Sequence, residues 1–179
     1  MGIEIERRFL VENEDWKSQV ILSEDFIQAY LNSSIDKWST RIRIIDNNKA
    51  FITLKSSLNG LVNNEFEYSI PTKDAIELIK LSTYKIIKTR YQLTIHNIDW
   101  VVDIFHGSNT SLKIAEIELN SESEEIQVPP WCGQEITGIK SLSNASLAKT
   151  PISELSLKDR MNSQRANRPL DCLNNWPYK

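Results

Sequence analysis

Cysteine, histidine and glycine are scarce in this sequence of 179 residues, with two, two and five copies respectively. The cysteines, Cys132 and Cys172, form no CxxC pair, and neither lies close to a histidine in the sequence. These spacings exclude a zinc cluster, a disulfide framework and a Cys–His nucleophile pair. Two free thiols are typical of a reducing compartment, so we expect a cytoplasmic protein.

Long apolar runs and positive net charge are missing as well. No stretch approaches the roughly 20 apolar residues of a membrane helix, and the opening MGIEIERRF is charged from its fourth residue, unlike a signal peptide. The formal net charge of −3 provides no basic field to gather nucleic acid. The GxxxxGK[ST] motif of a P-loop is also absent. We therefore expect no nucleic-acid or membrane partner.

The sequence does contain apolar and polar residues that alternate with a period of two, which is typical of β-strands. Turn residues separate the alternating segments, as at 46–48 and 57–60. Strands are predicted over 3–11, 26–32, 38–45, 50–57, 62–70, 84–95, 100–105 and 113–119. Helices are predicted over 73–81, with Thr72 as its cap, and over 144–149 and 153–165. About eight strands joined by short turns predict a mainly β protein of the α+β class.

Charged residues occupy one face of most predicted strands. Residues two apart in a strand share a face and lie about 7 Å apart. The pairs concerned are Glu4 and Glu6, Arg41 and Arg43, Glu65 and Glu67, Lys88 and Arg90, and Glu116 and Glu118. On a single strand such a face is usually wet, or paired with its neighbour. On six or seven strands it indicates a charged interior, provided that the sheet closes into a barrel.

A charged interior has a specific chemical use. Buried charges are costly unless they are paired or bind ions. Arginine and lysine suit phosphate oxygens, and paired carboxylates suit Mg²⁺ or Mn²⁺. Both sets in one cavity point to a metal–phosphate complex.

The order of these segments resembles the CYTH superfamily, also called triphosphate tunnel metalloenzymes. EIERRFLV at 4–11 is similar to the family's ExExK signature. The resemblance continues through QAYL, TRIRI, FITLKS, EFEYSI, IKTRY, VVDIF, AEIEL, PPWCGQEITG and SNASLA, and covers about residues 3–150. It implies an eight-stranded antiparallel closed barrel, or tunnel, with helices packed outside. We expect this domain to span 1–150, with a helical or irregular extension, 151–179, packed on it.

The resemblance also implies roles for individual residues. The expected ligands of Mg²⁺ or Mn²⁺ are Glu4, Glu6, Asp103, Glu116 and Glu118. The expected phosphate-binding residues are Arg8, Arg41, Arg43, Lys55, Lys88, Arg90 and Lys140. Glu65 and Glu67 match tunnel-lining glutamates. For catalysis our hypothesis assigns Glu4 and Glu6 to orienting water, Lys88 to the leaving side, and Tyr30 to a phosphate oxygen.

The sequence departs from the family pattern at three places. Arg8 stands where the signature has lysine, and Ala29 replaces a common glycine. Residues 139–144 keep only Lys140 and the Ser-Asn of the family's DKRYSN. Arginine and lysine differ in geometry at a phosphate site, so these changes could alter activity.

The function implied is metal-dependent hydrolysis of a small-molecule triphosphate, foremost inorganic tripolyphosphate. The alternatives are a nucleoside or thiamine triphosphatase, a class IV-type adenylate cyclase, and a non-catalytic module that binds polyphosphate or nucleotides. The resemblance also suggests a homodimer.

Overall fold

A computed structural model describes residues 2–32, 38–59 and 61–154 of the chain. The strands are β1 (Gly2–Val11), β2 (Val20–Asn32), β3 (Ser39–Ile45), β4 (Lys49–Ser57), β5 (Val62–Ser69), β6 (Lys85–Ile95), β7 (Ile98–Phe105), β8 (Lys113–Glu118) and β9 (Cys132–Glu135). The helices are α1 (Thr72–Lys80) and α2 (Asn144–Lys149). Short 3-10 turns are η1 (Asp15–Gln19), η2 (Gly107–Asn109) and η3 (Lys140–Leu142).

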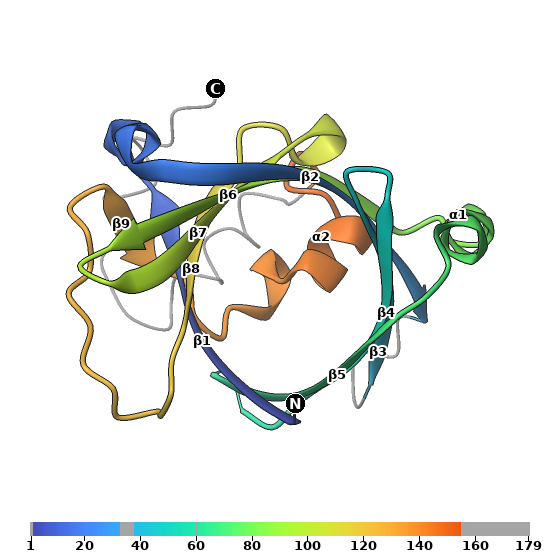
Figure 1. Ribbon diagram of the computed structural model, residues 1–179, viewed down its shortest axis with the longest axis horizontal. Helices are drawn as coiled ribbons and strands as arrows, with labels where there is room; N and C mark the ends of the chain where they lie inside the picture. The colour runs from blue at the N-terminus through green and yellow to red at the C-terminus, as the bar shows by residue number, and fades with distance from the viewer. Residues whose placement is uncertain (1, 33–37, 60, 155–179) are drawn as a thin grey trace.

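Eight strands form a closed antiparallel barrel (Figure 1). The sheet order is β5-β4-β3-β2-β6-β7-β8-β1, and β1 also pairs with β5, which closes the ring. β1 is the shared strand, with its first residues opposite β5 and later residues, such as Arg8, opposite β8. β9 joins the end of β1, where the pairing register shifts between Phe9 and Val11. The predicted fold class is therefore confirmed, with β9 as an additional short strand.

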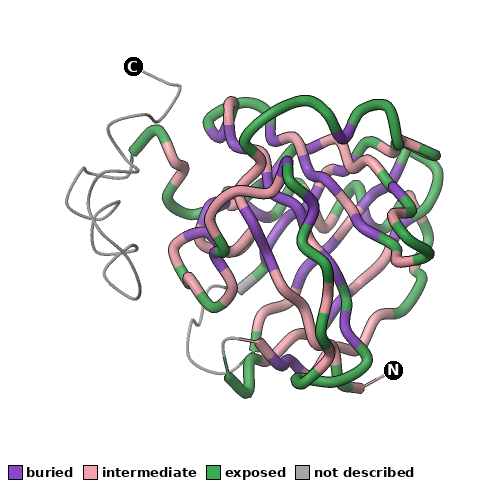
Figure 2. The backbone as a smooth tube through the Cα atoms, turned by 90° about the vertical axis from the view of Figure 1, so that its left-hand side faces the viewer, coloured by how far each residue is buried: buried purple, intermediate pink, exposed green. Residues whose placement is uncertain are grey.

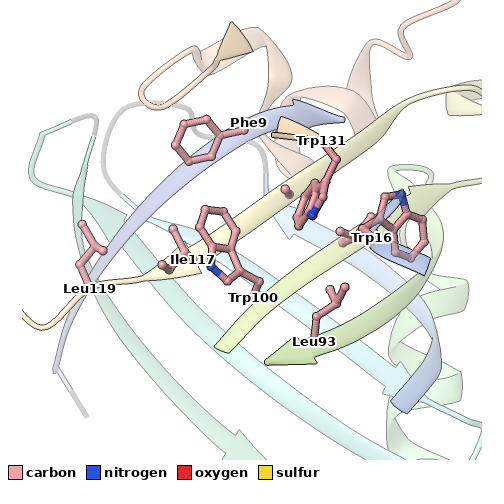
Figure 3. Close-up of a cluster of buried hydrophobic side chains, with 9 residues drawn as sticks. Phe9, Trp16, Leu93, Trp100, Ile117, Leu119 and Trp131 are labelled. Carbon is pink, nitrogen blue, oxygen red and sulfur yellow. The ribbon is translucent and has the colours of Figure 1, made fainter. Parts of the chain in front are cut away.

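Apolar side chains on the outside of the barrel are covered on two sides. α1 packs Ala75 against the outward-facing Ile42, Ile44 and Ala50. A second cluster gathers around Trp100, whose ring centroid lies 5.8 Å from that of Phe9 and 5.9 Å from that of Trp131 (Figure 3). Each fully buried side chain of this size contributes roughly 2–3 kcal/mol of hydrophobic stabilisation. Buried and exposed positions alternate clearly only over short stretches, such as residues 85–88 of β6, because both faces of the barrel wall are partly covered (Figure 2).

One end of the barrel is closed by the η3–α2 segment. Tyr30, Ile86 and Phe105, on the inner faces of β2, β6 and β7, pack with Leu142 of η3 and Leu147 of α2. Figure 1 shows α2 lying across the ring, whereas α1 packs against its outer wall. The barrel interior is therefore a tunnel with one apolar, covered end.

Several local features differ from the sequence predictions. β2 begins at Val20, six residues before the predicted start, and η1 and β9 were not predicted. The cap prediction at Thr72 is wrong: Pro71 occupies the N-cap position, and Thr72 Oγ1 donates to the carbonyl of Asn48, 3.0 Å away. The predicted turn at 46–48 is confirmed, with positive φ at Asp46 and Asn47.

Two expectations concern the end of the chain and membranes. The predicted helix over 153–165 lies outside the described residues from position 155 onward. The division of the chain after residue 150 stays a prediction. Across the described ranges, no helix has the length and apolar composition needed to cross a bilayer.

Candidate active site

Side chains from non-adjacent strands meet inside the barrel. Lys55 on β4 forms ion pairs with Glu4 and Glu6 on β1, although β5 lies between those strands. Arg90 on β6 likewise reaches Glu116 on β8, past β7. Such contacts require the charged faces to point toward a common interior. The predicted convergence of acids and bases is thus observed.

One ion-pair network joins strands β1, β6, β7 and β8. Arg90 holds Asp103 through two bonds of 2.7 Å, from Nε to Oδ1 and from Nη2 to Oδ2, and its Nη2 lies 2.6 Å from Glu116 Oε2. Arg8 Nε donates to Glu116 Oε1 at 3.1 Å, and its Nη2 donates to the carbonyl of Leu142 at 3.0 Å. Arg8 therefore ties the network to the segment that closes the tunnel.

Burial and paired charge set the protonation states in this network. Burial, reinforced by the neighbouring Arg90, lowers the pKa of Lys88 to about 8, although Lys88 contacts the carboxylate of Asp103. Burial opposes ionisation of Glu116, but the cations Arg90, Lys88 and Arg8 outweigh it and hold its pKa well below the usual range. A lysine whose pKa is strongly shifted by burial beside a specific charge partner is a common feature of functional sites.

The second network gathers three carboxylates around one ammonium group. Lys55 Nζ contacts Glu4 and lies 3.5 Å from Glu6 Oε1 and 3.2 Å from Glu65 Oε2. Burial, with the nearby Glu6 and Glu65, raises the pKa of Glu4 to about 7 despite Lys55. Asn63 Nδ2 also donates to Glu4, at 3.4 Å. Negative charge is therefore in excess around this point of the tunnel.

Arg41 and Thr53 extend the second network along the tunnel wall. Arg41 Nη2 lies 3.2 Å from Glu65 Oε1 and 3.2 Å from Glu67 Oε2. Thr53 Oγ1 donates to Glu67 Oε2 at 2.6 Å and accepts from Arg41 Nη2 at 3.1 Å. Arg43 Nη1 is 3.6 Å from the same Glu67 oxygen. The two glutamates of β5 therefore hold the two arginines of β3 in place.

Phe26 provides an aromatic surface beneath three cations. Its ring centroid lies 5.4 Å from Arg43 Cζ, 5.8 Å from Lys88 Nζ and 5.5 Å from Arg90 Cζ. Cations over an aromatic face are attracted by the ring's quadrupole. Phe26 thus helps to concentrate positive charge in the middle of the tunnel.

The predicted metal ligands are divided between the networks. Asp103 and Glu116 are paired with bases. Glu118 is exposed and lines a pocket of about 230 Å³ together with Glu4, Glu65 and Glu67. Within the described ranges, no three His, Cys, Asp or Glu side chains are arranged as a metal-binding group. The carboxylate oxygens and the excess negative charge at Glu4 nevertheless fit a hard divalent cation.

Two other predicted residues occupy different surroundings. Tyr30 is buried, and burial raises the pKa of its phenol, so it is a hydrogen-bond donor at neutral pH. Lys140 is exposed in η3, and the structure does not bring it into either network. Its assignment as a phosphate-binding residue therefore has no geometric support.

Sequence reasoning missed four polar or aromatic residues of the tunnel: Phe26, Gln28, Thr53 and Asn63. Phe26 and Gln28 lie on the same face of β2 as Tyr30, because these three residues are two positions apart, and Thr53 lies two residues before Lys55 on β4. The same period-two pattern that selected the charged residues would have placed them on the inner face. They were overlooked because uncharged residues do not stand out in a search for acids and bases.

Comparison with known proteins gives consistent relationships. The curated inorganic triphosphatase of Acetivibrio thermocellus is 37% identical over 153 residues, which cover 84% of this chain and 96% of that protein. The inorganic triphosphatase of Nitrosomonas europaea is 31% identical over 150 residues, covering 81% and 96% respectively. The crystal structure of an inorganic triphosphatase superposes with a TM-score of 0.61 at 30% identity, over 81% of this chain and 93% of that one. The CYTH domain family model matches residues 2–150. The chain therefore belongs to the CYTH domain family.

Proposed function

We propose that this protein hydrolyses a short triphosphate compound, foremost inorganic tripolyphosphate, with the help of a divalent metal. The observation that carries the proposal is the tunnel itself, where six cations and at least six carboxylates face one interior. They are Arg8, Arg41, Arg43, Lys55, Lys88 and Arg90, with Glu4, Glu6, Glu65, Glu67, Asp103 and Glu116. The similar proteins named inorganic triphosphatase support the same substrate class.

Metal dependence is a property of the family, and this chain offers a place for the ion. We assign Mg²⁺ or Mn²⁺ to Glu4 and Glu6, with Glu118 on the neighbouring strand as a further ligand. Glu6 and Glu118 are directly opposite in register. When bound, the metal would neutralise phosphate charge and polarise the bond to be cleaved.

The basic residues would hold the phosphate chain. They are paired with acids in the structure, so substrate binding would exchange carboxylate partners for phosphate oxygens. Arg41 and Arg43 can each hold two oxygens, and Lys88 can neutralise charge on the leaving side. Tyr30, which remains protonated, can donate to a phosphate oxygen. Glu4 and Glu6 would orient the water that attacks the terminal phosphorus.

A phosphate-release assay tests the proposal. The wild-type protein and Glu6→Gln are given tripolyphosphate, ATP or thiamine triphosphate with Mg²⁺ or Mn²⁺. We expect metal-dependent release, fastest with tripolyphosphate, abolished by a chelator and reduced at least about a hundredfold in Glu6→Gln. Equal rates in both proteins would remove Glu6 from the chemistry.

The same assay separates the alternatives. A cyclic nucleotide product from ATP would indicate a cyclase. Thermal stabilisation by tripolyphosphate with no turnover under either metal would indicate a binding module. A homodimer and a cytoplasmic location stay predictions.

A further inference from the structure

Gln28 is a buried amide on the tunnel wall without a partner in the described chain. It lies between Phe26 and Tyr30 on the inner face of β2, and it is 0% exposed. Neither its Nε2 nor its Oε1 has a hydrogen-bond partner among residues 2–32, 38–59 and 61–154. Nearly every buried polar group in a folded protein is paired, because an unpaired one costs free energy. The amide therefore requires a partner that is not one of these residues.

Arg43 is the cross-strand neighbour of Gln28, and it too has a buried polar atom without a hydrogen-bond partner in the described ranges. The two residues pair in register between β2 and β3, which places their Cβ atoms about 5 Å apart on one face. Arg43 Nε is buried and has no acceptor in the described ranges. These two cross-strand neighbours thus each carry a hydrogen-bond donor without an acceptor in the described ranges.

The charge around this pair favours an anion. Phe26, two residues before Gln28 on the same face, carries Arg43, Lys88 and Arg90 over its ring. In the other direction, Tyr30 belongs to the apolar cluster that closes the tunnel. Gln28 is therefore the last residue on the inner face of β2 before this apolar cluster. A phosphoryl oxygen meets both requirements, since it accepts several hydrogen bonds and is attracted by the cations.

We infer that Gln28 is a substrate-binding residue for the phosphoryl group nearest the closed end of the tunnel. Its Nε2 donates to a phosphoryl oxygen beside Arg43, and its Oε1 accepts from a water held with the substrate. The inference rests on the proposed function, because it takes the ligand to be a triphosphate. A neutral amide adds a directed bond there without changing the charge balance of the tunnel.

Replacement of Gln28 by leucine tests this role, because leucine is of similar size and cannot form hydrogen bonds. We expect kcat/KM for tripolyphosphate to fall about tenfold to a hundredfold, as for loss of a bond to a charged group. The rise in Tm on adding tripolyphosphate should shrink. The Tm of the ligand-free variant should stay the same or increase, because an unpaired buried amide has been removed.

Two further variants sharpen the experiment. Gln28→Glu keeps the size but replaces the donor with a carboxylate, and we expect it to lose more kcat/KM than Gln28→Leu. Gln92→Leu on β6 is the matched control, since Gln92 is exposed and donates to Glu24 at 3.1 Å. It should match the wild type in both readouts.

The outcomes are distinguishable. A purely structural Gln28 would give a lower ligand-free Tm in Gln28→Leu and an unchanged response to tripolyphosphate, which would overturn the inference. If the wild type hydrolyses tripolyphosphate and Gln28→Leu has the same kcat/KM, the inference about Gln28 is overturned and the proposed function stands. Binding without turnover in the wild type would reject the proposed function, and the thermal shift would then decide the role of Gln28. Neither binding nor turnover would reject both.

Discussion

Lys55 on β4 contacts Glu4 on β1 across the width of β5. Lys55 Nζ also lies 3.5 Å from Glu6 Oε1 and 3.2 Å from Glu65 Oε2, so one cation forms ion pairs with three carboxylates. This arrangement explains why the pKa of Glu4 is raised even beside a lysine: burial and two further negative charges outweigh the one positive charge. We therefore expect the removal of Lys55 to change metal binding in the tunnel more than the removal of any other residue.

We predict that Lys55→Met increases stabilisation by Mg²⁺ while reducing catalysis. Without the ammonium group, three carboxylates are left unbalanced, so a divalent cation should raise the Tm of the variant more than that of the wild type. Turnover of tripolyphosphate should fall about a hundredfold, because a phosphate contact is lost. Thermal shift with MgCl₂ and a phosphate-release assay measure the two effects.

Lys49→Met provides the control for Lys55→Met. Lys49 is exposed on the same strand, and its Nζ lies 3.7 Å from Glu24 Oε1. We expect wild-type behaviour in both assays. An equal response of both variants to Mg²⁺ would contradict the assigned role of Lys55.

We predict that the stability of the ligand-free, metal-free protein falls as pH rises from about 4.5 to 7. The pKa of Glu4 is raised to about 7 in the folded protein from 4.5, so the folded state binds more protons in this window. The resulting contribution to the free energy of unfolding is fully present below pH 4.5 and is lost by pH 7, and its upper limit is about 3 kcal/mol. Glu4→Gln should remove this component and be more stable than the wild type at pH 8.

Urea denaturation at pH 5, 6, 7 and 8 measures the effect for Glu4→Gln. Glu122→Gln, at an exposed position outside the barrel strands, controls for the loss of one negative charge. The interpretation fails if Glu4→Gln shows the same pH dependence as the wild type.

We predict that Arg90→Lys damages both stability and activity although the charge is kept. A lysine cannot make the two parallel bonds to Asp103 while also reaching Glu116. The free energy of unfolding should fall by about 1–3 kcal/mol, and kcat/KM by about tenfold to a hundredfold. Arg7→Lys is the matched control, because Arg7 also holds a carboxylate, Glu135, through two bonds, at a partly exposed position outside the tunnel. There the loss should stay below about 1 kcal/mol, with activity unchanged.

We predict that Trp100→Ala destabilises the barrel by about 3–5 kcal/mol, as expected for removal of a fully buried aromatic side chain. Trp100 is 1% exposed and contacts both Phe9 and Trp131 in the outer cluster. Denaturant unfolding measures the loss. A change below 1 kcal/mol would mean that the cluster does not anchor the segment leading to β9.

The sequence by itself determined which side chains share a face. The period of two along a strand is a property of the extended backbone, so Glu4, Glu6 and Arg8 had to point to one side, whatever the rest of the chain does. The turn residues Asp46 and Asn47, which adopt positive φ, similarly determined a hairpin. These features are local, and both are present in the structure.

Only the tertiary structure decided which groups meet. Whether the charged face is wet or enclosed depends on β1 pairing with β5, a contact between segments about sixty residues apart. The order along the chain does not reveal that Lys55 reaches Glu4, that Lys140 stays outside the networks, or that Gln28 is buried without a described partner. Local periodicity orients a side chain within its own strand, whereas closure of the sheet brings distant strands within contact distance, and that second step depends on the whole chain.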